Sequence, residues 1–163
     1  MPASRHDLFA RLEALGIETT TRDHAAVFTV EEARTLRGEI AGGHCKNLFL
    51  KDAKGELWLI VCLEDTRIDL KGLPQKIGSG RLSFGRPELL REVLGIEPGS
   101  VTPFALINAT SLEDHVVLEQ AMMAHALLNY HPLENTATTT IAAPDLVKFL
   151  RACGHDPQIV ALA

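Results

Sequence analysis

The sequence predicts an α+β fold: a single domain over residues 1–163, with a mixed, mostly antiparallel sheet flanked by helices. The length of 163 residues and a hydrophobic content of 46% fit one domain with a sizeable packed core. Two strongly apolar strand patterns joined by a tight turn predict a hairpin in the first half. Helical patterns alternate with further short strands, and no internal repeat, linker or low-complexity segment interrupts them.

The chain opens with a helix and a strand. Apolar side chains recur at helical spacing over residues 6–15, and Gly16 marks the end of this helix. Residues 18–24 are rich in threonine, a β-branched residue that favours strands. We therefore expect a short strand at residues 18–24 after the first helix.

A second helix is expected over residues 30–37. Thr29 and Glu32 have the spacing of a capping box, in which each side chain satisfies a free backbone N–H at a helix start. Gly38 follows the last periodic residue and is expected to end the helix.

The hairpin is the clearest pattern in the sequence. Residues 46–51 contain the apolar run Leu48-Phe49-Leu50, residues 56–63 are mostly apolar with β-branched Ile60 and Val61, and the turn Ala53-Lys54-Gly55 joins the two segments.

Two helices are expected in the middle of the chain, over residues 69–77 and 87–94, with a loop at residues 78–80 between them. Pro87 suits the first turn of a helix, where no N–H is needed, and Gly95 suits the position just past a helix end.

The C-terminal part completes the sheet. Pro144 and Gly154 bound a last helix that ends at Cys153. The expected strands of this part lie at residues 104–108, 116–119, 126–129, 138–142 and 159–162.

The charge distribution limits the possible partners. The net charge of −5 argues against indiscriminate binding to DNA or RNA. Residues 67–91 nevertheless carry six basic and two acidic side chains, a net of +4, whereas residues 92–163 carry a net of −6. An acidic protein with one basic side can bind one polyanion in one orientation. A solvated helix face is the alternative interpretation.

The sequence predicts a cytoplasmic location. Residues 1–12 lack the apolar region of a signal peptide, and no apolar run has the length needed to cross a bilayer. The three cysteines are an odd number without a CxxC pair, so a disulfide framework is not expected.

Two common chemistries do not fit the sequence. Gly38 and Gly43 have the separation of a phosphate-binding loop, but His44 and Cys45 stand where that motif needs Lys and Ser or Thr. No HxxxH, HExxH or paired CxxC motif is present, so we expect no bound metal and no cofactor.

Nucleophilic catalysis has little support from the residue patterns. Ser100 does not lie in a GxSxG turn. A Cys45–His131 pair is one interpretation, and a small buried cysteine is the other.

Polar residues at strand ends remain as site candidates. Lys46 and Asn47 follow two glycines at a strand start and could bind phosphate or carbonyl groups. His131 lies between an apolar strand and Pro132, where its ring could act on a substrate or only hold the turn.

Three segments carry a resemblance to a known family: GGHCKNLFLKD, LGIEPGSVTPFAL and LLNYHPLENTATT. In this order they resemble the trans-editing aminoacyl-tRNA deacylases of the YbaK/ProX type, relatives of the editing insertion domain of bacterial prolyl-tRNA synthetase. CKNLFLKD and YHPLENTATT are most similar to the ProXp-ala branch, which hydrolyses alanyl-tRNA mischarged on the proline tRNA.

The resemblance implies roles for individual residues. Lys46 matches a family lysine thought to engage the phosphates at the tRNA 3′ end. Asn47 matches a family residue that holds the aminoacyl end. His131 matches a histidine that positions the substrate. Gly99 and Pro103 match a GxxxP loop that offers backbone groups beside the ester.

Further residues are assigned to substrate binding. Ser100, Thr138 and Thr139 supply hydroxyl groups near these motifs, and Arg81 and Arg86 supply charge for tRNA docking. The expected catalytic residues are therefore Lys46, Asn47, His131 and Gly99, and the expected substrate-binding residues are Ser100, Pro103, Thr138, Thr139, Arg81 and Arg86.

The implied reaction is attack of water on the aminoacyl ester, assisted by the 2′-hydroxyl of the tRNA, and needs neither metal nor triad. The implied partner is mischarged tRNA(Pro). A transient complex with prolyl-tRNA synthetase or with an elongation factor is left open. Binding to DNA or to a membrane is not expected. Two alternatives remain: a binding module that holds an aminoacyl or nucleotide end without hydrolysis, and a deacylase for cysteine, serine or 2-aminobutyrate.

Overall fold

The structure, a computed structural model, describes residues 2–26, 30–108 and 115–162. Within these residues, eight strands form one sheet in the order β1-β7-β6-β2-β3-β5-β8, and β4 pairs with β2 outside this path. Four pairings are antiparallel and three are parallel, which confirms the mixed, mostly antiparallel sheet. The strands are β1 Thr19–Asp23, β2 Gly43–Asp52, β3 Leu57–Leu63, β4 Leu82–Phe84, β5 Val116–Glu119, β6 Leu127–Tyr130, β7 Ala137–Ala142 and β8 Gln158–Val160.

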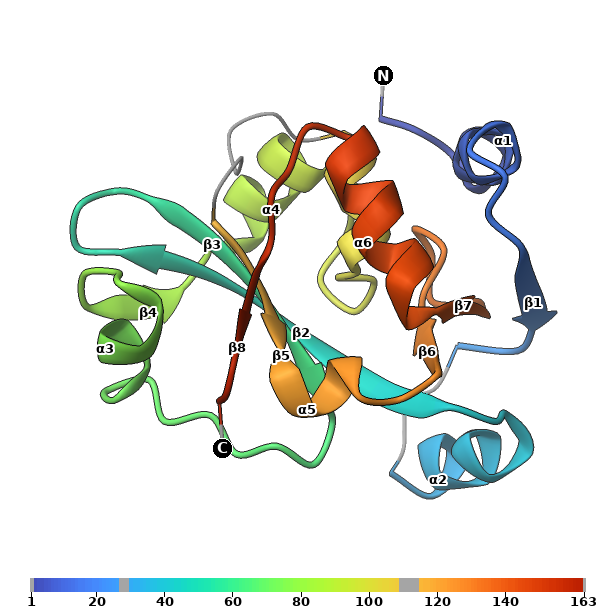
Figure 1. The fold of residues 1–163 in the computed structure, drawn as a ribbon, viewed down its shortest axis with the longest axis horizontal. Coiled ribbons are helices and arrows are strands. Elements are labelled where there is room, and N and C mark those ends of the chain that lie inside the picture. Colours follow the sequence, from blue (N-terminus) through green and yellow to red (C-terminus); the bar gives the residue numbers. More distant parts are fainter. Residues whose placement is uncertain (1, 27–29, 109–114, 163) are drawn as a thin grey trace.

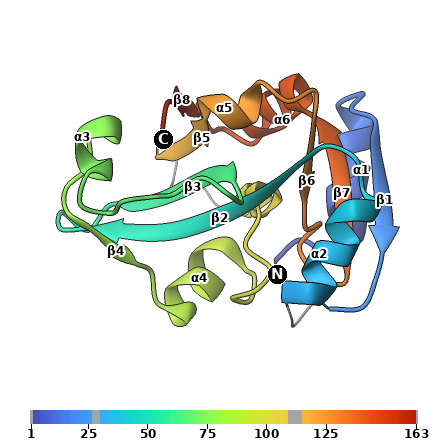
Figure 2. The ribbon, with the colours of Figure 1, turned by 90° about the horizontal axis from the view of Figure 1, so that it is seen from below.

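The helices flank this sheet (Figures 1 and 2). They are α1 Arg5–Ala14, α2 Val30–Glu39, α3 Leu73–Ile77, α4 Pro87–Leu94, the 3-10 helix η1 Pro103–Ile107, α5 Gln120–Met123 and α6 Ala143–Ala152. Figure 1 shows α2 beside the start of β2, whereas α3 and β4 lie near the other end of that strand.

The strand β2 joins the two parts of the sheet. Its first residues pair in parallel with β6, residues 45–51 pair with β3, and its last residues pair with β4. Because side chains alternate across a strand, β2 and β3 contribute to two cores. Phe49, Leu59 and Val61 pack with α1, α4, η1 and α6, whereas Leu50 and Ile60 pack with α3.

Most predicted elements are confirmed, but three expectations were wrong. The strand expected over residues 104–108 is the 3-10 helix η1, because Pro103 lacks an N–H for a ladder and the Thr102 hydroxyl caps the Phe104 N–H. The helix expected at residues 69–77 begins only at Leu73, after a turn in which the carbonyl of Asp69 accepts from the N–H groups of Gly72 and Leu73.

The third wrong expectation is the end of the second helix, because α2 continues through Gly38 to Glu39. The capping box at Thr29 falls outside the described residues. The short elements β4 and α5 were not predicted, because three or four residues carry too little periodicity to be recognised.

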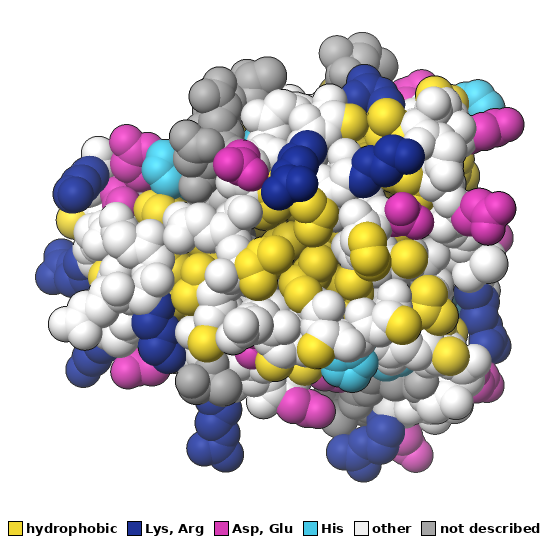
Figure 3. All heavy atoms as spheres, in the orientation of Figure 1, with side chains coloured by type: hydrophobic (Ala, Val, Ile, Leu, Met, Phe, Trp, Pro, Cys, Tyr) yellow, Lys and Arg dark blue, Asp and Glu magenta, His cyan; other side chains and the backbone are white. Residues whose placement is uncertain are grey.

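The face shown in Figure 3 carries apolar side chains near its middle, where β8 crosses in Figure 1. Ile159 of β8 is among the exposed large hydrophobic residues. No described helix is long and apolar enough to span a membrane.

Candidate active site

The site is built around the start of β2, and two glycines allow this start to pack closely against β6. A Cβ atom on Gly42, whose φ is +106°, would lie 3.0 Å from the Asn129 side-chain nitrogen. The Asn129 amide donates hydrogen bonds to the carbonyl groups of Ala41, at 3.0 Å, and Gly43, at 3.2 Å. Asn129 therefore holds the glycine loop in place.

Alternation along β2 sends its polar side chains to opposite faces of the sheet. Cys45 lies on the face of the larger core, together with Asn47. Lys46 lies on the other face, where its ammonium donates a 2.5 Å hydrogen bond to the carbonyl oxygen of Thr66. The structure therefore does not place Lys46 beside Asn47 in one cavity.

A cavity of about 270 Å³ opens beside Asn47. It lies where α2 runs alongside β2 and β6, an arrangement visible in Figure 2. Its lining residues are Leu36, Ile40, His44, Cys45, Asn47, Glu64, Asn129, Tyr130, His131 and Thr138. The sequence-predicted residues Asn47, His131 and Thr138 thus meet at one cavity.

His131 has a defined tautomer. It follows β6, and its Nδ1 lies 2.9 Å from the carbonyl oxygen of Ala137 on β7. Because a carbonyl only accepts, Nδ1 carries the proton and Nε2 of the neutral ring is an acceptor. Burial lowers the pKa of His131, and this outweighs the opposite effect of the Ala137 hydrogen bond. The imidazole is therefore neutral near pH 7.

Asn47 links the cavity to the loop that carries Gly99. Its Nδ2 donates to the carbonyl oxygen of Val101 at 3.0 Å, which fixes the orientation of the amide. Its Oδ1 is buried without a hydrogen-bond partner among the described residues. A buried acceptor without a partner is costly, so a ligand donor beside it would be stabilised.

The two threonines predicted for substrate binding face opposite ways. Thr138 lines the cavity and its hydroxyl lies 2.9 Å from Nε2 of His24. Thr139 is fully buried, and its hydroxyl is hydrogen-bonded to the hydroxyl of Thr21 on β1 at 2.8 Å. Thr139 therefore holds the β1–β7 pair together, away from the cavity.

The GxxxP loop lies next to the cavity rather than in its lining. Gly99 and Ser100 border a second hollow, together with residues 133–135. The Ser100 N–H is already bonded to the carbonyl of Glu97, and Pro103 is buried at the start of η1. Within the described residues, only the Asn47–Val101 hydrogen bond connects this loop to the polar side of the cavity.

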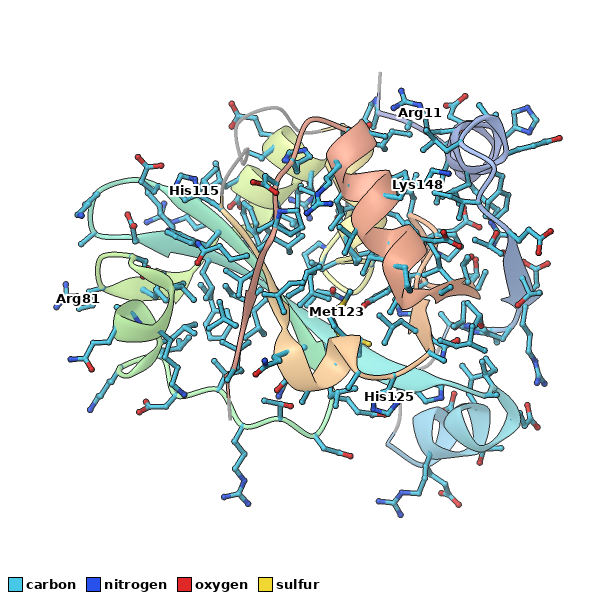
Figure 4. The ribbon with its side chains drawn as sticks, viewed as in Figure 1. Arg11, Arg81, His115, Met123, His125 and Lys148 are labelled. Atoms are coloured by element: carbon cyan, nitrogen blue, oxygen red, sulfur yellow. The ribbon has the colours of Figure 1, made fainter. Side chains whose placement is uncertain are left out.

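Arg81 and Arg86 lie in a groove at the other end of β2, shared with Lys51 and with Phe84, whose side chain is 64% exposed. Figure 4 shows Arg81 beside α3 and β4, whereas His125 lies near the α2 end of the molecule. The two arginines are therefore separate from the cavity and could contact only a ligand that extends along the protein.

Cys45 is a poor nucleophile. Burial raises its pKa to about 12, so the thiol is protonated near pH 7. The thiol also lies 3.7 Å from the carbonyl oxygen of Gly43. This favours the small buried cysteine over the Cys45–His131 pair. Within residues 2–26, 30–108 and 115–162, no cluster of three or more His, Cys, Asp or Glu residues could hold a metal ion.

Sequence reasoning missed two residues that shape the site, Asn129 and His24. Asn129 is a polar residue inside an apolar strand, which was a usable signal. His24 ends a threonine-rich strand in a part of the chain without other site residues, and only the fold brings it to Thr138.

The mixed sheet and the polar cavity define the class of protein. Residues 24–149 match the family model of the aminoacyl-tRNA editing domain. The chain therefore belongs to this family, and with it to the aminoacyl-tRNA deacylases, hydrolases that act in translation fidelity.

The names of the relatives refer to prolyl-tRNA editing or to prolyl-tRNA synthetase. The chain is 35% identical over 160 residues to the prolyl-tRNA editing protein ProX of Acetoanaerobium sticklandii, and the match covers 98% of each chain. It is 37% identical over 161 residues to the prolyl-tRNA synthetase associated domain-containing protein 1 of Mus musculus, covering 96% of this chain and 95% of that one.

Solved structures share the fold. A crystal structure of a candidate trans-editing enzyme for prolyl-tRNA synthetase superposes with a TM-score of 0.74 at 20% identity, covering 100% of this chain and 99% of that one.

Proposed function

We propose that this protein hydrolyses alanyl-tRNA(Pro), releasing alanine and free tRNA. The family supplies the reaction class, and the names of the relatives supply the link to proline tRNA. The observation that carries the proposal is that one cavity is lined by a neutral His131 and by Asn47, whose Oδ1 has no hydrogen-bond partner among the described residues.

The reaction is a hydrolysis of an activated ester. The oxygen of water bonds to the carbonyl carbon of the aminoacyl group, and the bond between that carbon and the ribose oxygen breaks. The proton lost by the water reaches the leaving ribose oxygen with help from the neighbouring 2′-hydroxyl. The protein holds the ester and orders the water, and Nε2 of His131 accepts a hydrogen bond from the bound substrate.

Selectivity comes from the walls of the cavity. Apolar groups of Leu36, Ile40, Cys45 and Tyr130 face the same space as the polar residues. The cavity of about 270 Å³ holds more than an alanyl group, so exclusion of a proline ring by overlap requires that these groups narrow the part that takes the side chain. Exclusion is needed, since a synthetase pocket made for proline binds alanine only about 1–3 kcal/mol less well for each missing methylene.

The tRNA body is proposed to reach the groove of Arg81 and Arg86. Both side chains are exposed, and Lys51 adds a third positive charge to the same groove, whose lining also carries Asp52, Glu88 and Glu92. Prolyl-tRNA synthetase is the proposed source of the mischarged tRNA, and a transient complex with it or with an elongation factor would shorten the path of the substrate. A cytoplasmic location stays a prediction.

Deacylation of alanyl- and prolyl-tRNA(Pro) by the purified protein tests the proposal. We expect rapid loss of the alanyl ester and survival of the prolyl ester. Equal hydrolysis of both esters, or faster hydrolysis of cysteinyl, seryl or 2-aminobutyryl esters, would move the protein to another specificity. Tight binding without hydrolysis of any ester would make it a binding module.

A further inference from the structure

The cavity is rich in hydrogen-bond acceptors. None of its described lining residues is a lysine or arginine, and Glu64 adds a carboxylate to the lining. Asn47, His131 and Thr138 form its polar side and are called the acceptor wall below. Such a surface favours a positively charged ligand group that donates hydrogen bonds.

His24 fixes the polarity of Thr138. The backbone N–H of His24 donates to the carbonyl of Thr136 at 2.8 Å, which extends the β1–β7 ladder and holds the histidine beside β7. Nδ1 of His24 lies 2.8 Å from the carbonyl oxygen of Ala25, and Nε2 lies 2.9 Å from the Thr138 hydroxyl. Because the Ala25 carbonyl only accepts, the Nδ1–H of the neutral ring donates to it. Nε2 then accepts a hydrogen bond from the hydroxyl of Thr138.

This arrangement leaves hydrogen-bond acceptors on three residues that line the cavity. A threonine hydroxyl has one proton and two lone pairs, so a Thr138 that donates to His24 can only accept from a ligand. The same argument applies to His131. Its Nδ1–H donates to the carbonyl oxygen of Ala137, so the lone pair of Nε2 remains as an acceptor. Asn47 adds Oδ1, whose orientation is fixed by the bond from Nδ2 to Val101.

Register supports the grouping of the acceptors. Asn129 on β6 pairs with Thr140 on β7, and continuing this antiparallel register by one two-residue step places His131 opposite Thr138. The Thr140 hydroxyl donates to Asn129 at 2.5 Å, and Thr140 is not part of the cavity lining. The acceptor wall is therefore the part of this face that stays available to a ligand.

We infer that the acceptor wall binds the α-ammonium group of the aminoacyl ester, and that His24 is a positioning residue that keeps Thr138 an acceptor. An ammonium has three donors and no acceptor, which matches the oxygen of Thr138, Nε2 of His131 and the oxygen of Asn47. This inference rests on the proposed deacylase function and deepens it. It means that a free α-amino group is a recognised part of the substrate.

Deacylation of alanyl-tRNA and lactyl-tRNA tests the inference. Treatment of alanyl-tRNA with nitrous acid replaces the amine by a hydroxyl and gives lactyl-tRNA, which keeps the methyl group and the ester. The two esters differ in intrinsic reactivity. For each protein we therefore define the alanyl preference as kcat/KM for alanyl-tRNA divided by kcat/KM for lactyl-tRNA. Comparing this preference between a variant and wild type cancels the intrinsic difference.

We expect His24→Ala and Thr138→Val each to lower the alanyl preference by about tenfold or more, the effect of one hydrogen bond to a charged group. The double variant should lose little more than the larger single effect, because both changes remove the same acceptor. His24→Gln, whose amide oxygen can accept from Thr138, should retain part of the preference. The exposed His6→Ala is the control and should behave as wild type.

If His24 had a purely structural role, His24→Ala would lower kcat/KM for both substrates equally and leave the alanyl preference unchanged. That result would overturn the inference. A second measurement needs no turnover: the affinity for alanine linked by an amide to 3′-amino-3′-deoxyadenosine, against its lactyl counterpart. Wild type should prefer the alanyl compound and His24→Ala should not. Equal affinities in wild type also overturn the inference. A preference without hydrolysis of any ester would instead sustain it and reject the proposed function.

Discussion

The ammonium of Lys46 donates a 2.5 Å hydrogen bond to the carbonyl oxygen of Thr66, on the face of β2 that is turned away from the acceptor wall. The hydroxyl of Thr66 is in turn bonded to both oxygens of the buried Glu119, at 2.8 and 2.9 Å. An ammonium has three donors, so this contact leaves two donors for a phosphate. Lys46 could act by binding phosphate or by holding the turn that follows β3.

Lys46→Ala should lose most of the deacylation, at least about tenfold in kcat/KM, because a hydrogen bond from a charged group is worth about 1.5–3 kcal/mol. The fold should survive, since the side chain is not part of either core. Thermal unfolding and single-turnover deacylation check this. The exposed Lys148→Ala on α6, labelled in Figure 4, is the matched control.

Salt dependence separates the two roles of Lys46. If the lysine binds phosphate, the variant should show a slope of log affinity against log salt that is smaller by about 0.7–0.9, the contribution of one phosphate contact. An unchanged slope together with a lower rate would assign Lys46 to the turn instead. Activity near wild type in a folded variant would reject both roles.

Asn47→Ala should separate activity from stability. The variant loses the hydrogen bond to Val101, which costs about 1 kcal/mol of unfolding free energy, but it also removes a buried oxygen without a partner. We expect a small change in stability and a drop of about tenfold or more in kcat/KM for alanyl-tRNA, the size of one charge-assisted contact. Denaturant unfolding and deacylation of the same preparation provide the comparison. A large loss of stability with equal loss of activity would contradict a binding role.

The sequence was sufficient where a pattern was long or chemically distinct. The hairpin of β2 and β3 was predicted because its apolar runs are long, and α4 was predicted with its ends because Pro87 and Gly95 mark them. The strand expected at residues 104–108 failed because a five-residue apolar run has no distinguishing period, and Thr102 and Pro103 decide its conformation locally.

For the site, sequence motifs identified Asn47, His131 and Thr138 but not how they meet. Adjacent residues such as Lys46 and Asn47 share a motif yet face opposite sides of a strand, and only the fold decides which of the two faces carries the cavity. His24 could not be found, because its contact with Thr138 joins residues 114 positions apart.

Arg81→Glu and Arg86→Glu should weaken tRNA binding without slowing the chemical step. The side chains share a groove with Lys51, at the other end of β2 from the cavity. We expect KM to rise several-fold while the single-turnover rate at saturating substrate changes little, because these residues do not contact the ester. Arg151→Glu, on the exposed part of α6, should leave KM unchanged. Binding that proves insensitive to added salt would make the groove a solvated surface.

Asp52 should be a main determinant of stability at the hairpin. Its carboxylate accepts hydrogen bonds from the backbone of Lys54, Glu56 and Gly80 and from the Trp58 indole, at 2.9–3.1 Å. Burial raises its pKa, but the four hydrogen bonds together outweigh this and lower it. Asp52→Ala should cost about 2–4 kcal/mol of unfolding free energy, because it leaves buried donors without partners.

The pH dependence of stability checks the assignment of Asp52. A folded pKa below the unfolded value means that stability is present above about pH 3.9 and is lost as the pH falls through the folded pKa. Urea unfolding of wild type at pH 7 and pH 3 should show this loss, and Asp52→Asn should reduce it. Asp156→Asn, at an exposed position, should keep the wild-type difference.

His131 should set the acidic limit of activity. Burial lowers its pKa, so the ring stays neutral below the ordinary value of about 6.5 and Nε2 remains an acceptor there. We expect kcat/KM for alanyl-tRNA to hold as the pH falls past 6.5 and to decline only at lower pH, when His131 gains a proton and its acceptor becomes a donor. His131→Gln should be slower at neutral pH and should lack this acidic decline, whereas His6→Ala should retain it.

The same protonation of His131 should destabilise the fold. Because the folded pKa lies below the unfolded one, unfolding takes up a proton in the interval between the two values, and the free energy of unfolding decreases as the pH falls below about 6.5. In wild type, stability should therefore begin to decline at a higher pH than activity, because activity is lost only when the folded ring gains its proton, and His131→Gln should weaken both dependences. An acidic decline of activity that persists unchanged in His131→Gln would assign the titration to another group and remove the histidine from the acceptor wall.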